Sequence, residues 1–136
     1  MSVGILLITH NDIGAALLHT ASRMLGRCPL AARALAVTEE CKPDRLRVEA
    51  QALVEQLDTG EGVLVLTDLF GSTPSNIANT LQTSCERRVL AGVNLSMLVR
   101  VLNYPALSLT DMADKALSGG RDGVLLCPNR DKEPEP

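Results

Sequence analysis

Short apolar runs alternate along this chain with longer segments whose apolar residues recur at every third or fourth position. The short runs have the length and composition of buried strands, and we expect strands at residues 3–9, 33–37, 63–66, 88–90 and 124–127. The longer segments have the spacing of amphipathic helices, which we expect to begin near residues 12, 43, 74, 94 and 108. Strands and helices therefore alternate, apart from two consecutive helices before the last strand.

Capping and helix-breaking residues delimit several of these helices. Pro74 stands where a helix would have its first residue, a position that proline tolerates. Asn94, and then either Ser108 or Thr110, are expected to cap the last two helices through their side-chain oxygens. The pair Gly119-Gly120 predicts the end of the last helix.

Strands that alternate with amphipathic helices are typical of an α/β fold, here a three-layer sandwich with a mainly parallel sheet and helices on both faces. We predict a strand order of 2-1-3-4, which places the first and third strands side by side. No internal repeat or linker interrupts the pattern, so residues 1–127 are expected to form one domain. Residues 128–136 are polar and proline-rich, and they predict a disordered tail.

The composition narrows the classes of function. The 136 residues carry a net charge of -3, with scattered lysine and arginine and no tryptophan. Because the chain lacks a basic stripe and has only one tyrosine and one phenylalanine for base stacking, we expect no nucleic-acid partner. No apolar run is long enough to span a bilayer, and the N-terminus lacks the pattern of a signal peptide. We therefore expect a cytoplasmic protein.

Four cysteines are present, at Cys28, Cys41, Cys85 and Cys127. They lie far apart in the sequence and form no CxxC pair. We therefore expect reduced thiols in or near the core rather than a metal site or a disulfide.

Polar residues follow the first and third predicted strands. The first strand ends in Thr9-His10-Asn11, and the third ends in Thr67-Asp68. In an open parallel sheet, ligands bind outside the carboxyl ends of the strands, where the strand order reverses. With the first and third strands adjacent, His10 and Asp68 are expected to face each other across this crevice.

A histidine and a carboxylate placed in this way suit nucleophilic phosphoryl transfer. Asp68 would accept a hydrogen bond from one ring nitrogen of His10 and leave the lone pair of the other nitrogen free to attack phosphorus. The turn at Gly71, Ser72 and Thr73 would hold the phosphoryl oxygens with backbone N–H groups and hydroxyls at the start of a helix. We also place Thr9 among the phosphoryl-binding residues.

Each of these residues also has a purely structural interpretation. His10 could be a solvated loop residue, and Asp68 could bond to amides of the following turn. Thr73 and Pro74 could be an ordinary N-cap and first helical residue. The functional hypothesis depends on the two strand ends lying next to each other.

Three stretches, GILLITHNDIGAALLHTA, GVLVLTDLFGSTPSNIA and VLAGVNLSMLVRVLNY, resemble the mannose-type enzyme IIA domain of the bacterial phosphotransferase system. The resemblance covers residues 2–127. It implies that His10 receives a phosphoryl group from the phosphocarrier HPr and passes it to an enzyme IIB. It also implies that Asp68 hydrogen-bonds to His10, and that Ser72 and Thr73 belong to the hydroxyl-bearing turn.

The same resemblance implies a four-stranded parallel sheet and a homodimer that exchanges its last strand, which corresponds to Val124–Cys127. It implies no metal or organic cofactor, and contact with the membrane only through a transporter complex. The chain departs from the family pattern at Asn11 and Ser72, where glycine is usual, and at Ser96, where proline is usual. Asparagine tolerates a left-handed backbone well, so Asn11 is compatible with the turn.

Three alternative functions stay open at this point. The domain could signal its phosphorylation state to another protein without any transporter, or it could be the phosphotransfer subunit of a dihydroxyacetone kinase. A flavodoxin-like binder of nucleotide or flavin is the third alternative. The absence of a GxGxxG motif and the scarcity of aromatic residues count against it.

Overall fold

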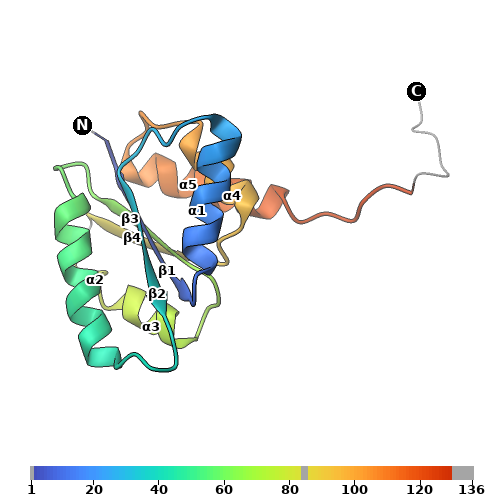
Figure 1. Cartoon of the computed structure of the whole chain (residues 1–136). Coiled ribbons are helices and arrows are strands. Elements are labelled where there is room, and N and C mark those ends of the chain that lie inside the picture. Colours follow the sequence, from blue (N-terminus) through green and yellow to red (C-terminus); the bar gives the residue numbers. More distant parts are fainter. Residues whose placement is uncertain (1, 84–85, 130–136) are drawn as a thin grey trace.

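The computed structural model describes residues 2–83 and 86–129, which form an α/β sandwich of three layers (Figure 1). In these residues four parallel strands form one sheet in the order β2-β1-β3-β4. The strands are β1 (Gly4–His10), β2 (Ala32–Val37), β3 (Val63–Thr67) and β4 (Arg87–Ala91). The predicted fold class and the predicted strand order are both confirmed.

Helices cover both faces of the sheet (Figure 1). On one face lie α1 (Ile13–Leu25), α4 (Leu95–Leu102) and α5 (Leu109–Asp122). On the other face lie α2 (Pro43–Leu57) and α3 (Thr73–Asn79). Among the described residues, no helix combines the length and the apolar composition that crossing a membrane requires.

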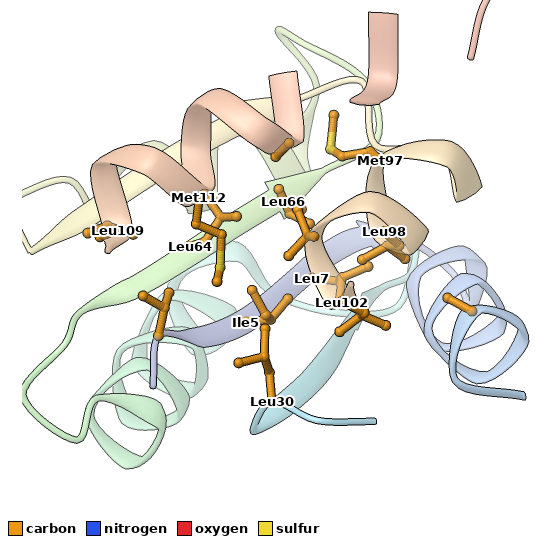
Figure 2. Close-up of a cluster of buried hydrophobic side chains, with 14 residues drawn as sticks. Ile5, Leu7, Leu30, Leu64, Leu66, Met97, Leu98, Leu102, Leu109 and Met112 are labelled. Carbon is orange, nitrogen blue, oxygen red and sulfur yellow. The ribbon is translucent and has the colours of Figure 1, made fainter. Parts of the chain in front are cut away.

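The central strand β1 divides the core into two clusters. Ile5 and Leu7 point to the side of α1, α4 and α5, where Figure 2 shows them among aliphatic side chains and methionines. Leu6 and Ile8 point to the side of α2 and α3. Since all four are fully buried, each contributes roughly 1.5–3 kcal/mol of hydrophobic stabilisation. Burial on both faces explains why this strand is a continuous apolar run.

The helix caps follow the sequence closely. Asn94 Oδ1 accepts the N–H of Met97 at 2.9 Å, and Ser108 Oγ accepts the N–H of Asp111 at 3.3 Å. The third helix starts one residue earlier than predicted, because its N-cap is Ser72 and Pro74 is the second helical residue. Proline is accepted there because the first N–H groups of a helix have no partner within the helix.

The predicted helix end at Gly119-Gly120 is wrong, since α5 continues to Asp122 and both glycines are buried. A Cβ atom at Gly119 would lie 2.7 Å from Cβ of Arg100, and one at Gly120 would lie 2.8 Å from Cε of Met97. The missing side chains therefore let α5 approach α4 closely. A glycine required by packing looks the same in sequence as one that ends a helix.

The predicted last strand, Val124–Cys127, does not form in the single chain. The described residues beyond Gly123 run away from the domain without secondary structure (Figure 1). Their apolar side chains are exposed, and Leu126 is 96% exposed. A strand needs a hydrogen-bonding neighbour, and none of the described strands pairs with this segment. Exchange of this strand with a second copy stays a prediction, and residues 130–136 of the predicted tail lie outside the described residues.

The cysteines differ from the expectation in their burial. Cys28, Cys41 and Cys127 are free thiols, as expected, but all three are exposed rather than in the core. They lie in connecting loops and in the C-terminal segment, outside the strands and helices that form the core. Cys85 lies outside the described residues.

Candidate functional site

The adjacent strands β1 and β3 bring His10 and Asp68 together at the carboxyl edge of the sheet. The ring atom Nδ1 of His10 lies 2.9 Å from Oδ2 of Asp68. The backbone N–H of His10 donates to the same oxygen at 3.0 Å. The predicted juxtaposition of the two side chains is therefore confirmed.

The carboxylate of Asp68 is held in place and charged. Its second oxygen, Oδ1, accepts the N–H of Leu69 at 3.0 Å. Burial raises the pKa of this carboxyl, but the hydrogen bonds from the ring and the backbone N–H of His10 outweigh it, so the pKa lies below the usual 3.8. At neutral pH Asp68 therefore only accepts hydrogen bonds.

This charge state decides the tautomer of His10. Because Asp68 cannot donate, Nδ1 of His10 must carry the shared proton. In the neutral ring the free lone pair is then on Nε2. The side chain of His10 is 42% exposed, compared with 14% for Asp68, so the histidine is the accessible member of the pair. A half-exposed imidazole of fixed tautomer is suited to nucleophilic attack.

The loop after His10 turns sharply into α1. Asn11 has a φ of 49°, in the left-handed region. Its N–H donates to the carbonyl oxygen of Val37 at 2.9 Å, which ties the loop to the end of β2. Asparagine tolerates this conformation better than most residues, so the expectation that Asn11 is compatible with the turn is confirmed.

The turn between β3 and α3 contains the other predicted residues. Gly71 has a φ of 83°, and apart from Gly71 and its two chain neighbours no residue has an atom within 4 Å of the place where its Cβ would be. The hydroxyl of Ser72 donates to the carbonyl oxygen of Leu69 at 2.5 Å. Thr73 borders the same pocket as His10. Of these three residues, Thr73 is the one that the structure brings into a common pocket with the histidine.

That pocket has a volume of about 710 Å³ and is lined by His10, Asn11, Val37, Thr38, Glu39, Glu40, Cys41, Pro43 and Thr73. Sequence analysis missed the wall formed by residues 38–41. Nothing in the sequence marks this loop, because it joins the site only through the pairing of β2 with β1. A larger hollow of about 890 Å³ runs along the exposed start of α2 and contains none of the predicted site residues.

Thr9 is placed differently from the prediction. It is 1% exposed, and its Oγ1 accepts the N–H of Gly14 at 2.8 Å. The hydroxyl therefore lies beneath the loop that carries His10 rather than in the pocket. The prediction that Thr9 contacts a phosphoryl group is therefore wrong.

A metal site does not emerge from residues 2–83 and 86–129, because nowhere in them do three His, Cys, Asp or Glu side chains come together with metal-binding geometry. The candidate reactive groups are therefore the His10–Asp68 pair and the adjacent turn.

The sequence model of the family described as PTS system fructose IIA component, the mannose-type enzyme IIA, matches residues 4–116. The chain belongs to this enzyme IIA family. It is 33% identical over 127 residues to the PTS system mannose-specific EIIAB component of Escherichia coli (strain K12). That alignment covers 91% of this chain and 39% of the relative, so the chain spans less than half of the relative's length.

Solved enzyme IIA structures share the fold. The mannose/sorbose specific IIA subunit of the phosphotransferase system from Enterococcus faecalis superposes with a TM-score of 0.84 and is 25% identical. The alignment covers 99% of this chain and 98% of that one. The phosphotransferase system component EIIA from Streptococcus agalactiae is also 25% identical, with a TM-score of 0.77 and coverage of 92% and 96%.

Proposed function

We propose that this chain is a cytoplasmic phosphohistidine carrier that accepts a phosphoryl group from HPr on His10 and passes it to an enzyme IIB. Membership of the enzyme IIA family supports a phosphotransfer role in a sugar phosphotransferase system. The observation that carries the proposal is the contact of 2.9 Å between Nδ1 of His10 and the charged carboxylate of Asp68. Contact with a membrane is then indirect, through the transporter complex.

The reaction requires no proton to move at His10. The lone pair on Nε2 attacks phosphorus, and a nitrogen–phosphorus bond forms. The bond between phosphorus and the donor atom breaks, and its electron pair stays on the donor. The ring becomes positively charged while Nδ1 keeps its proton, and the adjacent carboxylate of Asp68 stabilises that charge. Transfer to the acceptor is the reverse step with a different partner.

The turn that follows Asp68 is proposed to hold the phosphoryl oxygens. Thr73 faces the common pocket, and the left-handed Gly71 leaves open space beside the backbone of the turn. The backbone N–H and the hydroxyl of Thr73 are the proposed donors, since the N–H of Ser72 already donates to the carbonyl oxygen of Leu69 at 3.3 Å. Such contacts neutralise charge on the transferred group, which is the main requirement of phosphoryl transfer.

A homodimer is the second part of the proposal. The extended segment beyond Gly123 exposes Val124, Leu125 and Leu126, and burial against a second copy would remove these apolar side chains from water. Sedimentation of the purified protein tests this point. A dimer that becomes a monomer when residues 124–127 are deleted supports exchange, and a monomeric full-length chain contradicts it.

The carrier function is tested by incubation with phosphoenolpyruvate, enzyme I and HPr, followed by intact-mass spectrometry at alkaline pH. We expect a gain of ~80 Da that mild acid removes, as for a phosphohistidine. His10→Ala should show no gain. His19→Ala is the matched control, because His19 is the chain's other histidine and lies exposed on α1, and it should gain the full mass. Full labelling of His10→Ala would refute the proposal.

A further inference from the structure

The hydroxyl of Thr9 connects the backbone on both sides of His10. Its Oγ1 accepts the N–H of Gly14 at 2.8 Å, and its O–H donates to the carbonyl oxygen of His10 at 3.4 Å. Gly14 is the second residue of α1, and the N-cap of that helix, Asp12, makes no capping hydrogen bond with its side chain. Thr9, a residue of the preceding strand, therefore accepts a hydrogen bond from the first turn of the helix, as an N-cap side chain normally does.

The close approach of α1 to β1 depends on Gly14. A Cβ atom on Gly14 would lie 3.0 Å from Oγ1 of Thr9 and 3.1 Å from Cβ of Leu7. The start of the helix thus rests directly on the strand, and the hydrogen bond from Gly14 to Thr9 closes a short loop. His10 and the left-handed Asn11 lie inside this loop.

The hydrogen bonds between His10 and Asp68 depend on the position of the His10 backbone. The ring and the backbone N–H of His10 both donate to one oxygen of Asp68. This arrangement requires the backbone and the ring to be placed together, since a displacement of the loop lengthens both hydrogen bonds. One end of the loop is tied to Val37 through the N–H of Asn11, and the other end is tied to Thr9 through Gly14.

We propose that Thr9 is a positioning residue for His10: its hydroxyl closes the loop from His10 to Gly14 and thereby holds the imidazole against Asp68. The inference rests on the carrier function proposed above. Thr9 is buried and lines no part of the pocket, so it acts through the backbone of His10 and touches neither the phosphoryl group nor a partner protein.

Thr67 provides a matched control in the same sheet. It is buried like Thr9, it precedes Asp68 as Thr9 precedes His10, and it ends the neighbouring strand. Its Oγ1 has no hydrogen-bond partner among the described residues. Replacing either threonine by valine removes a hydroxyl while keeping the shape of the side chain, but only at Thr9 does a hydrogen bond disappear.

The first measurement is the rate of phosphoryl transfer from phosphorylated HPr to the full-length chain. We expect Thr9→Val to slow transfer on the order of 10- to 100-fold, as misplaced reacting groups do, with the KM for HPr unchanged. Thr9→Ser keeps the hydroxyl and should restore the wild-type rate, and Thr67→Val should also match wild type. A wild-type rate in Thr9→Val, or equal losses in Thr9→Ser and Thr9→Val, would overturn the inference.

The second measurement separates positioning from stability. At a temperature where every variant is folded, the ¹⁵N resonances of the His10 ring report which nitrogen carries the proton. We expect a single tautomer in wild type and Thr67→Val, and a mixture in Thr9→Val. An unchanged ring signature in Thr9→Val contradicts the inference, because a stability effect alone leaves the ring of the folded protein unaltered.

Two further outcomes are distinguishable. If Thr9→Val does not fold, Thr9→Ser is compared with Thr9→Ala, and equal transfer rates in that pair would overturn the positioning role. If the wild-type chain accepts no phosphoryl group, the carrier proposal itself fails. If the wild-type chain is phosphorylated and Thr9→Val is phosphorylated at the same rate, the inference about Thr9 fails and the carrier proposal is unaffected.

Discussion

The ends of β1 and β3 have a similar arrangement of residues but are stabilised by different hydrogen bonds. Near the end of each strand a buried threonine is followed directly by a residue of the proposed site. At β1 the hydroxyl of Thr9 is hydrogen-bonded and the chain enters α1 through the left-handed Asn11. At β3 the hydroxyl of Thr67 has no partner among the described residues, and Asp68 itself makes the local hydrogen bonds.

The two strand ends therefore differ in how their site residues are held in place. Asp68 accepts three hydrogen bonds, one from Leu69 and two from His10, so the carboxylate organises its own turn and the histidine as well. The side chain of His10 is more exposed than that of Asp68, and the loop that follows it is hydrogen-bonded to Thr9 through the N–H of Gly14. A fixed acceptor next to a supported, half-exposed nucleophile is the arrangement that the proposed chemistry requires.

The largest expected effect comes from removing the fixed acceptor. Asp68→Ala should slow phosphoryl acceptance by roughly 100-fold or more, because the tautomer and the positive charge of the ring lose their support. The fold should persist, since Asp68 lies at the edge of the sheet. A phosphoryl-transfer assay measures the rate, and circular dichroism checks that the fold persists. Asp44→Ala, which removes an exposed carboxylate of α2, is the control and should transfer normally. Loss of the fold in Asp68→Ala would instead support a structural role.

The next effect concerns the backbone of the β1 end. Asn11→Val should lower the free energy of unfolding by about 1–3 kcal/mol, because a β-branched side chain is strained in the left-handed region. Asn11→Gly should not be destabilised in this way, since glycine adopts that region freely. Chemical denaturation of the two variants tests the difference. Equal stabilities would show that this φ of 49° places no demand on the side chain.

The two buried threonines allow the most direct test of the comparison through stability. Thr9→Val should lower the free energy of unfolding by about 1–3 kcal/mol, because the N–H of Gly14 loses its partner. Thr67→Val should be neutral or slightly stabilising, since a buried hydroxyl without a partner is removed. Thermal or chemical denaturation of both variants decides. Equal destabilisation at the two sites would mean that Thr67 has a partner in solution.

The smallest effect is a dependence of stability on pH. The pKa of Asp68 is lower in the folded chain than its usual 3.8, so the unfolded chain binds the proton first as the pH falls. The stabilisation from Asp68 is therefore fully present above 3.8 and is lost as the pH drops through the lower folded value. Denaturation between about pH 5 and pH 2 should show the stability difference between wild type and Asp68→Asn shrinking. A difference that grows toward low pH would contradict the sign.

The local parts of the candidate site were predictable. His10 and Asp68 stand directly after apolar runs, and a parallel sheet brings such ends to one edge. The cap at Asn94 was equally visible, because a cap depends on residues three positions apart. These features rest on neighbours in the sequence and on the rule that parallel strands share an edge.

What the sequence missed or predicted wrongly concerns how the elements pack. The pocket wall at residues 38–41 was not predicted, and it depends, like the glycine pair in α5, on contacts between distant segments. Thr9 is only five residues from its partner Gly14, but its hydroxyl is buried because α1 packs closely on β1. Residues 124–127 have the apolar composition of a strand, but a strand needs a partner, and the four strands of the described residues do not pair with them. Residue type and spacing carry no information about such partners.

The sequence by itself determined the order of strands and helices as far as the last helix, the α/β class and the two residues at the centre of the candidate site. Tertiary structure decided that Nδ1 of His10 meets a charged Asp68 and that Thr9 supports the loop from below. Periodicity depends on the local chain, which repeats every 2 or 3.6 residues in strands and helices. Hydrogen bonds between His10 and Asp68 depend on strand register across more than fifty residues, which only the packed sheet specifies.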